Sequence, residues 1–292
     1  EGLGNQLFMY AHSYSVSKKN DFELFIDPYS GYYQKKHIYN FFLDRLNISS
    51  KIASKNYIFA NKYRNFIKKI LLFVDEFKTN KKFIFENKDH NKKSYFSELN
   101  FKNTNQYFFL DGNFESEKYF KHYRADLLNE FKIKNENQFN DNKYLDLIKN
   151  ENVISICVRQ HRFSERVKNA GQKSHILKSK LFVENTVNYI KKSIDYFNNK
   201  VKNPFYLVWS NDFKDLNPYF DNKDFIFVEN EKDKAITDFY LLTQCKYFIV
   251  GPSTFHWWGA WLSPHADKIC VRPKDINPSN NIDFWPENWV KI

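Results

Sequence analysis

The sequence has few cysteines, and none of them is in a metal-binding arrangement. Cys157, Cys245 and Cys270 lie in or beside separate apolar runs, and the chain has no Cys-x-x-Cys or His-x-x-x-His pair. This spacing argues against both a disulfide scaffold and a zinc site. We therefore expect three buried free thiols in a reducing compartment, and no metal ligands.

Long hydrophobic runs are also missing. No apolar stretch reaches the roughly 18–20 residues that a membrane span needs, and no signal peptide is visible. The chain begins at Glu1, directly on a glycine turn, so we expect the strand before that turn to be absent from this sequence. Hydrophobic residues still make up 42% of the 292 residues and aromatic residues 19%, which is enough to bury a core and excludes disorder as the main state.

The charge is strongly basic, with a formal net charge of +11. A basic balance suits an anionic partner, such as nucleic acid, an acidic membrane or a phosphorylated small molecule. It fits equally well with a Lys- and Asn-rich composition spread over the surface. No RNA-recognition signature occurs and the basic residues are scattered, so we expect no nucleic-acid partner. The Lys-rich stretch at 61–93 leaves peripheral contact with an anionic membrane open.

The two halves of the chain differ in pattern, and a polar, Asn- and Lys-rich segment at 132–143 is the best linker candidate. We therefore expect an N-terminal domain over 1–140 and a C-terminal domain over 141–292. In the first half, residues 81–97 are expected to form surface loop. The other elements expected there are helices at 5–18, 58–73 and 116–131 and strands at 22–26 and 107–110.

In the second half, short apolar strands alternate with helices. The strands are expected at 153–158, 205–209, 225–228, 247–250 and 268–271, and the helices at 180–196, 235–244 and 254–262. This alternation predicts a parallel, doubly wound α/β sheet. Ligands bind such sheets where strands end and helices begin. Three polar clusters fall at such points: Arg159, Ser210 to Asp212, and Ser253 with Thr254.

The richest string is Gly251-Pro-Ser-Thr-Phe-His-Trp-Trp-Gly-Ala-Trp261, which follows an apolar strand. A strand-to-helix turn presents backbone N–H groups that can hold a phosphate. Helix starts are common, so this geometry alone is weak support. The tryptophans, Trp257, Trp258 and Trp261, are expected to be core rather than a ligand platform.

Arg159 closes the strand at 153–158 and is expected to point into the ligand crevice. Its forked, permanently charged group suits a diphosphate, although a structural salt bridge to a nearby acid is an equal alternative. Asp238 lies early in a helix, where a carboxylate either caps the helix or accepts hydrogen bonds from a base or ribose. The turn Gly2-Leu-Gly-Asn-Gln6 lacks the third glycine of a dinucleotide fingerprint, so a dinucleotide cofactor is not expected. Asn5 can grip an oxyanion or cap the helix there.

Taken together, these strings resemble glycosyltransferase family 11, the α-1,2-fucosyltransferases, in a bacterial form. The similar segments are the opening Gly-Leu-Gly-Asn-Gln, the stretch Leu110-Asp-Gly-Asn-Phe-Glu-Ser-Glu-Lys-Tyr-Phe120, the strand leading to Arg159, and Asp238 to Trp261. Their order and spacing hold over nearly the whole chain. The last segment is the most specific.

The resemblance implies an α/β, GT-B-like fold with two Rossmann-like domains facing a cleft. The N-terminal domain would serve the acceptor and the C-terminal domain the nucleotide-sugar donor. The implied reaction is inverting transfer of L-fucose from GDP-β-L-fucose to a galactose 2-hydroxyl, with no cofactor and no required metal. The implied catalytic residues are Arg159, on the donor β-phosphate, and Asn5, at the reaction centre. The implied donor-binding residues are Gly4, Arg159, Asp238, Ser253, Thr254 and Phe255.

The chain departs from the family's His-x-Arg-Arg-Gly-Asp motif, because Cys157-Val-Arg-Gln-His-Arg162 keeps only its first arginine. A carboxylate base at the motif's Asp is therefore not available, and His161, Asp111 and Glu115 are the remaining candidates. The departure leaves open a transferase that uses another nucleotide sugar. We expect a bacterial cytoplasmic location, at the inner face of the membrane if the glycan acceptor is lipid-linked.

Overall fold

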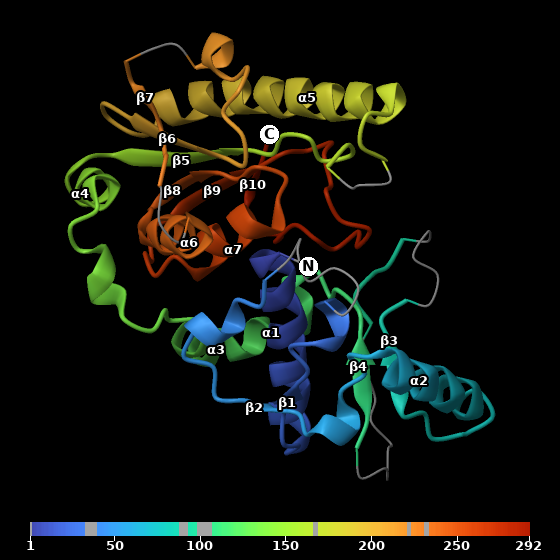
Figure 1. Ribbon diagram of the computed structural model, residues 1–292. Coiled ribbons are helices and arrows are strands. Elements are labelled where there is room, and N and C mark those ends of the chain that lie inside the picture. The colour runs from blue at the N-terminus through green and yellow to red at the C-terminus, as the bar shows by residue number, and fades with distance from the viewer. Residues whose placement is uncertain are drawn as a thin grey trace. The chain divides into compact units, whose positions relative to one another are not determined.

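The computed structural model describes residues 2–32, 40–87, 93–97, 107–165, 169–220, 223–230 and 234–292 (Figure 1). The chain divides into two compact units. The N-terminal unit comprises Glu1–Lys134 and the returning segment Ser279–Pro286, and the C-terminal unit comprises Asn135–Pro278 and Glu287–Ile292. The domain limits expected from the sequence differ from this division at two places. Residues 135–140 were expected in the N-terminal domain but belong to the C-terminal unit, and residues 279–286 were expected in the C-terminal domain but belong to the N-terminal unit. Glu1 lies outside the described residues.

The C-terminal unit is built on one six-stranded parallel sheet. The strands run in the order β10-β9-β8-β5-β6-β7. Their bounds are β5 Val153–Val158, β6 Phe205–Ser210, β7 Phe225–Phe227, β8 Tyr247–Ile249, β9 Ile269–Arg272 and β10 Val290–Lys291. The helices are α4 Lys143–Asn150, α5 Lys173–Asn198, α6 Lys234–Gln244 and α7 Thr254–Leu262. Figure 1 shows α5 on one face of the sheet and α6 and α7 on the other, as in a doubly wound fold.

Burial on both faces explains the composition of the central strand. All six residues of β5 are buried, so the strand reads as a continuous apolar run rather than an alternating one. On one face, Val187 and Ile190 of α5 join Ile154 and Ile156 in the main core. On the other face, α6 and α7 pack so closely that a Cβ added to Gly259 of α7 would lie 2.6 Å from the Cβ of Leu242 in α6.

The N-terminal unit contains α1 and two short parallel strand pairs. Its helices are α1 Leu3–Asn20, α2 Lys62–Asp75 and α3 Arg124–Glu130, and the strand pairs are β1 Phe25–Ile26 with β2 Lys51–Ile52 and β3 Phe83–Phe85 with β4 Phe109–Asp111. The core is aromatic: the ring of Phe8 lies 5.9 Å from that of Phe120 and 6.1 Å from that of Phe284. The second contact holds the returning segment in this unit.

The α/β class predicted from the sequence is confirmed, and every strand and helix expected in the C-terminal half is present. Of the helix expected at 116–131, the second half is present as α3, and the first half is wrong: two 3-10 turns, Glu117–Tyr119 and Lys121–Tyr123, precede α3. Phe120 leaves helical geometry at φ −145° and ψ −2° while its ring is fully buried. The surface loop expected at 81–97 also contains β3. The cysteines are buried and free, as predicted. In the described part of the chain, no helix is long and apolar enough to cross a membrane.

Candidate functional site

The strand order places a topological switch between β5 and β8. From β5 the chain builds β6 and β7 outward on one side, then crosses to build β8, β9 and β10 on the other. Ile154 and Ile156 of β5 pair with Tyr247 and Ile249 of β8. Ligands of doubly wound sheets bind outside the carboxyl ends of the strands at such a switch point. Arg159 directly follows β5, and the Gly251 turn directly follows β8.

The two strand ends are in close contact. A Cβ on Gly251 would lie 2.1 Å from the carbonyl oxygen of Cys157 and 3.1 Å from its Cβ. No side chain fits at this position, so the requirement for glycine is one of space. The close approach brings the start of α7 next to the strand that carries Arg159.

His256 fixes the turn from the inside. The N–H of Gly251 donates to His256 Nδ1 at 2.8 Å, and His256 Nε2 lies 2.9 Å from the hydroxyl of Ser155 in β5. Burial lowers the pKa of His256 to about 3, so the ring is neutral. Because Nδ1 is the acceptor, Nε2 carries the proton and donates to Ser155. Sequence reasoning gave His256 no role, although it stands inside the most specific string.

The start of α7 presents Ser253, Thr254 and Phe255. Ser253 caps the helix, since its Oγ accepts the N–H of Phe255 at 3.2 Å. These three residues are half-buried, whereas the tryptophans that follow are buried. The rings of Trp257 and Trp258 lie 4.9 Å apart. The prediction that the tryptophans are core is therefore confirmed.

Arg159 forms an ion pair with Glu165, the contact that a purely structural role would require. The arginine side chain is 36% exposed and the glutamate side chain 37%. The backbone N–H of Glu165 donates to the carbonyl of His161 at 2.8 Å, which holds the acid on the same loop. An ion pair at this exposure contributes little net free energy, so an incoming anion can replace the carboxylate.

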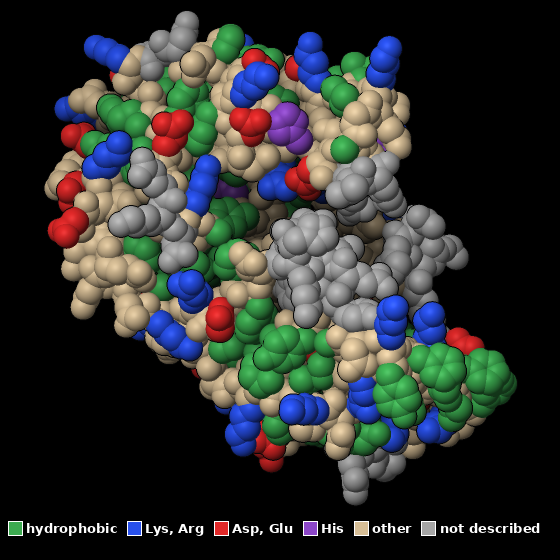
Figure 2. All heavy atoms as spheres, in the orientation of Figure 1, with side chains coloured by type: hydrophobic (Ala, Val, Ile, Leu, Met, Phe, Trp, Pro, Cys, Tyr) green, Lys and Arg blue, Asp and Glu red, His purple; other side chains and the backbone are tan. Residues whose placement is uncertain are grey.

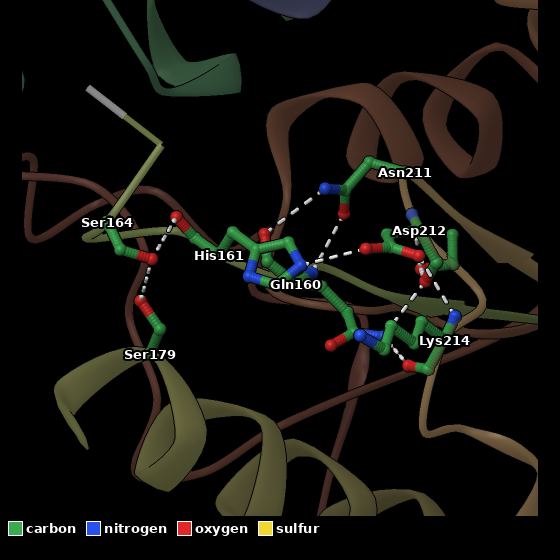
Figure 3. A network of polar contacts seen from close by, with 8 residues as sticks. Gln160, His161, Ser164, Ser179, Asn211, Asp212 and Lys214 are labelled. Carbon is green, nitrogen blue, oxygen red and sulfur yellow. Dashed lines mark hydrogen bonds and ion pairs between the residues drawn. The ribbon is translucent and has the colours of Figure 1, made fainter. Parts of the chain in front are cut away.

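A polar network joins the loops that follow β5 and β6 (Figure 3). The N–H of Gln160 donates to Asn211 Oδ1 at 2.8 Å, and the Asn211 amide donates back to the Gln160 carbonyl at 3.2 Å. The Gln160 side-chain amide also donates to the carbonyls of Asp212 and Lys214. The backbone of His161 is in the left-handed region, at φ 56°, and its Nε2 lies 2.9 Å from Asp212 Oδ2. Gln160, a departure from the family motif, therefore has a structural role.

Asp238 is a buried carboxylate in the first half of α6. Burial raises its pKa to about 6, against the opposing effects of a 2.6 Å hydrogen bond from the Asn230 amide and the charge of Lys234. Both Asp238 and Arg159 act electrostatically on the thiol of Cys157, whose pKa is raised by burial. The next residue of α6, Phe239, packs against Phe255 at the start of α7, with 6.0 Å between the ring centroids. Among the described residues, no group of three or more His, Cys, Asp and Glu is arranged to hold a metal ion.

The remaining predicted site residues belong to the N-terminal unit. Gly4 is buried and Asn5 half-buried in the first turn of α1. The N–H groups of Asn5 and Gln6 both donate to the carbonyl of Gly2 at 3.2 Å. The Gln6 side chain donates to the Asn40 carbonyl at 2.8 Å and accepts the N–H of Phe42 at 2.9 Å, a role that the sequence did not predict.

The predicted site residues of the C-terminal unit thus lie close together, whereas the others belong to the N-terminal unit. Arg159 and Ser253 to Phe255 follow the carboxyl ends of β5 and β8, and Asp238 lies in α6, which packs against the start of α7. Gly4 and Asn5 lie in the other unit. Glu165 and Asn230, which contact Arg159 and Asp238, were not predicted, because both are loop residues without a pattern of their own.

Comparison with known proteins gives consistent matches. The family model described as "Glycosyl transferase family 11" matches residues 1–292. The chain is 30% identical over 301 residues to an alpha-1,2-colitosyltransferase of Escherichia coli, covering 100% of this chain and 96% of the relative. It is 28% identical over 157 residues to the O-antigen biosynthesis glycosyltransferase WbnK of Escherichia coli, covering 49% and 52%. Among solved structures, the fucosyltransferase NodZ from Bradyrhizobium matches with a TM-score of 0.48 and 15% identity over 90% of each chain.

Proposed function

Because the chain belongs to glycosyltransferase family 11, we propose that it transfers L-fucose from GDP-β-L-fucose to the 2-hydroxyl of galactose in a surface glycan. The observation that carries this proposal is the switch point between β5 and β8, where Arg159 and the Ser253-capped start of α7 lie on adjacent strand ends. A permanent cation beside a helix N-terminus suits a diphosphate. The similarity to an O-antigen glycosyltransferase supports a polysaccharide acceptor.

The proposed reaction is a single displacement with inversion at the anomeric carbon. The galactose hydroxyl oxygen forms a bond to this carbon as the bond to the β-phosphate oxygen breaks. The bonding electron pair leaves on GDP, and the hydroxyl proton passes to solvent. Negative charge grows on the β-phosphate as the bond lengthens. Arg159, released from Glu165, and the start of α7 stabilise that charge more in the transition state than in the ground state, which lowers the barrier.

The remaining residues are proposed to bind the donor or to lie at the reaction centre. Ser253, Thr254 and Phe255 hold the diphosphate through hydroxyl and backbone groups, and Asp238 accepts hydrogen bonds from the guanine or ribose. Gly4 and Asn5 are assigned to the donor and the reaction centre on the resemblance of the opening turn alone. In this account protein groups neutralise the leaving diphosphate and no metal is needed, so transfer is expected to persist in EDTA.

A second donor is favoured by one observation, the 30% identity to a colitosyltransferase over the whole chain. Colitose is fucose without the 3-hydroxyl, so the two GDP-sugars present the same diphosphate and the same anomeric centre. The charge-stabilising groups would serve either donor. A fucose-specific site would differ by having a hydrogen-bonding partner for the 3-hydroxyl. Such a site strongly rejects a donor that lacks this hydroxyl, because the partner is then left unpaired.

The test is a donor screen followed by one variant pair. GDP-fucose, GDP-colitose, GDP-mannose and UDP-sugars are offered with a galactoside, and transfer is measured. We expect GDP-fucose or GDP-colitose to be used, and Arg159→Ala to lower kcat/KM by about 100-fold or more. Lys246→Ala is the matched control, because it removes one cation, paired with Asp267, at the opposite end of β8. Exclusive use of another nucleotide sugar, or Arg159→Ala activity within a few-fold of wild type, contradicts the proposal.

A further inference from the structure

Helix α2 of the N-terminal unit exposes a broad apolar side. Six apolar residues of α2, counting one that lies two positions past its end, are between 43% and 78% exposed: Tyr63, Phe66, Ile70, Phe73, Val74 and Phe77. Their spacing of mostly three and four residues puts them on one side of the helix. We call these six residues the α2 apolar stripe. Figure 2 shows hydrophobic side chains gathered with Lys and Arg over the position that α2 has in Figure 1.

The opposite side of α2 carries the half-buried Leu72 and the polar residues that attach the helix to its unit. Arg64 and Lys68 lie over the ring of Phe59, with the Arg64 Cζ 5.6 Å and the Lys68 Nζ 5.9 Å from its centroid. Arg64 Nε donates to the Ile58 carbonyl at 3.3 Å, and Lys68 Nζ lies 3.4 Å from Asp111 Oδ2. Most of the apolar surface of α2 is therefore exposed, whereas the apolar side of an ordinary surface helix faces the core.

Both ends of α2 are fixed in this orientation. Asn61 caps the start, accepting the N–H of Arg64 at 2.8 Å. At the other end, the buried carboxylate of Asp75 accepts the N–H groups of Lys82 and Phe83, which lead into β3. Lys81 Nζ donates to the carbonyls of Asp75 and Glu76. These contacts prevent the helix from rotating to bury its apolar stripe.

The surrounding charge indicates what the stripe meets. Residues 62–82 contain seven Lys or Arg and two acids, and one of these acids, Asp75, is buried. Lys62, Lys69 and Lys78 are exposed. Two copies of the chain joined along the stripe would bring these lysines toward one another, which is unfavourable. An anionic lipid surface complements both the apolar stripe and the lysines.

We propose that α2 binds the surface of an anionic bilayer, with its axis in the plane of the interface and its apolar stripe among the lipid headgroups and upper acyl chains. Aromatic and aliphatic side chains of such a helix enter the headgroup and acyl boundary, and flanking lysines contact anionic headgroups. None of the six stripe residues is among those assigned to the donor. It would hold the enzyme at the membrane, where a lipid-linked glycan acceptor would lie.

The direct test is co-sedimentation of the whole chain with lipid vesicles. We expect binding to vesicles of mixed phosphatidylglycerol and phosphatidylcholine, and weak binding to phosphatidylcholine alone. The double variant Phe66→Ser, Phe73→Ser is expected to lower partitioning onto the vesicles by about tenfold or more, because it removes two aromatic side chains that enter the bilayer. The control is Leu177→Ser, Leu181→Ser on α5, which removes two equally exposed apolar side chains elsewhere. Equal losses in both double variants would contradict the assignment to α2.

A second variant separates charge from insertion and from self-association. Lys62→Gln, Lys69→Gln is expected to lower binding to anionic vesicles by about tenfold and to weaken its salt dependence. Sedimentation velocity without lipid should give the same species for wild type and the Phe66, Phe73 variant. A dimer that this variant dissociates, with no change in vesicle binding, would assign the stripe to a second copy and overturn the proposal. Transfer to a soluble galactoside without lipid is expected to be unchanged in all α2 variants, so failure here leaves the proposed transferase activity untouched.

Discussion

Gly251 packs against the backbone of Cys157, leaving no room for a side chain between the carboxyl ends of β8 and β5. This contact sets the distance between the strand that carries Arg159 and the helix start that carries Ser253. The buried ring of His256 then ties the turn to Ser155 of β5. The proposed diphosphate site therefore rests on a rigid junction rather than on a mobile loop.

Gly251→Ala is expected to damage this junction. A methyl group 2.1 Å from the Cys157 carbonyl oxygen forces the two strand ends apart. We expect a loss of about 1–3 kcal/mol in the free energy of unfolding, measured by urea denaturation, and weaker GDP binding. Gly31→Ala is the matched control, since a Cβ at Gly31 meets nothing within 4 Å. If both variants unfold at the same urea concentration as wild type, the packing argument is wrong.

Glu165→Gln is expected to strengthen donor binding. The Glu165 carboxylate pairs with the Arg159 guanidinium and competes with a phosphate for it. Removing one exposed partner should lower the Kd for GDP by about two- to fivefold, measured by calorimetry. Asp267→Asn, which removes the acid paired with Lys246, should leave Kd unchanged. Weaker binding in Glu165→Gln would mean that the acid holds Arg159 in its binding position instead.

Asp238→Asn is expected to change how donor binding depends on pH. Burial raises the pKa of Asp238 to about 6, so the carboxylate that accepts hydrogen bonds from the nucleoside is lost as pH falls through that value. Wild-type affinity for an intact GDP-sugar should therefore fall between about pH 7 and 5. In Asp238→Asn the affinity should be lower at neutral pH and nearly flat over this range. Parallel profiles for the two proteins would remove Asp238 from the donor site.

His12→Phe is expected to reduce the acid sensitivity of the fold. His12 is buried against the rings of Phe114 and Tyr119, and neither ring nitrogen has a hydrogen-bond partner in the described structure. Burial lowers its pKa from 6.5 to about 3. Between these values the unfolded state binds the extra proton, so stability falls as pH decreases below about 6.5.

His12→Phe should lose the pH dependence of the free energy of unfolding that His12 causes. This dependence amounts to about 1.4 kcal/mol per pH unit between the two pKa values. Urea denaturation at several pH values measures it, with His122→Gln at an exposed position as the control. Equal slopes for wild type and His12→Phe would show that the histidine does not remain neutral in the fold.

The sequence predicted those parts of the fold that depend on local pattern. The strand at 153–158 and the helix at 254–262 have the predicted bounds, because a continuous apolar run identifies the strand and a strand-to-helix turn identifies the start of the helix. The break at Phe120 was missed, since it is imposed by packing of that ring against Phe8 in a distant helix. In the candidate site, Arg159 and Ser253 were predicted from their places at strand and helix ends.

Other parts of the site depend on contacts that no local pattern encodes. Glu165 forms an ion pair with Arg159 within one loop, and His256 of α7 links the Gly251 turn to Ser155 of β5. Gln160 was read only as a departure from a motif, whereas its amide joins the loops after β5 and β6. These roles arise from the tertiary structure.

The central claim is that Arg159 binds the β-phosphate at the switch point between β5 and β8. The most direct measurement compares the affinities of GDP and GMP, which differ by that phosphate, in wild type and Arg159→Ala. We predict that wild type binds GDP about tenfold or more tightly than GMP. Arg159→Ala should remove most of this difference, and Lys246→Ala should retain it. A GDP-to-GMP preference that is the same in Arg159→Ala as in wild type would contradict the account.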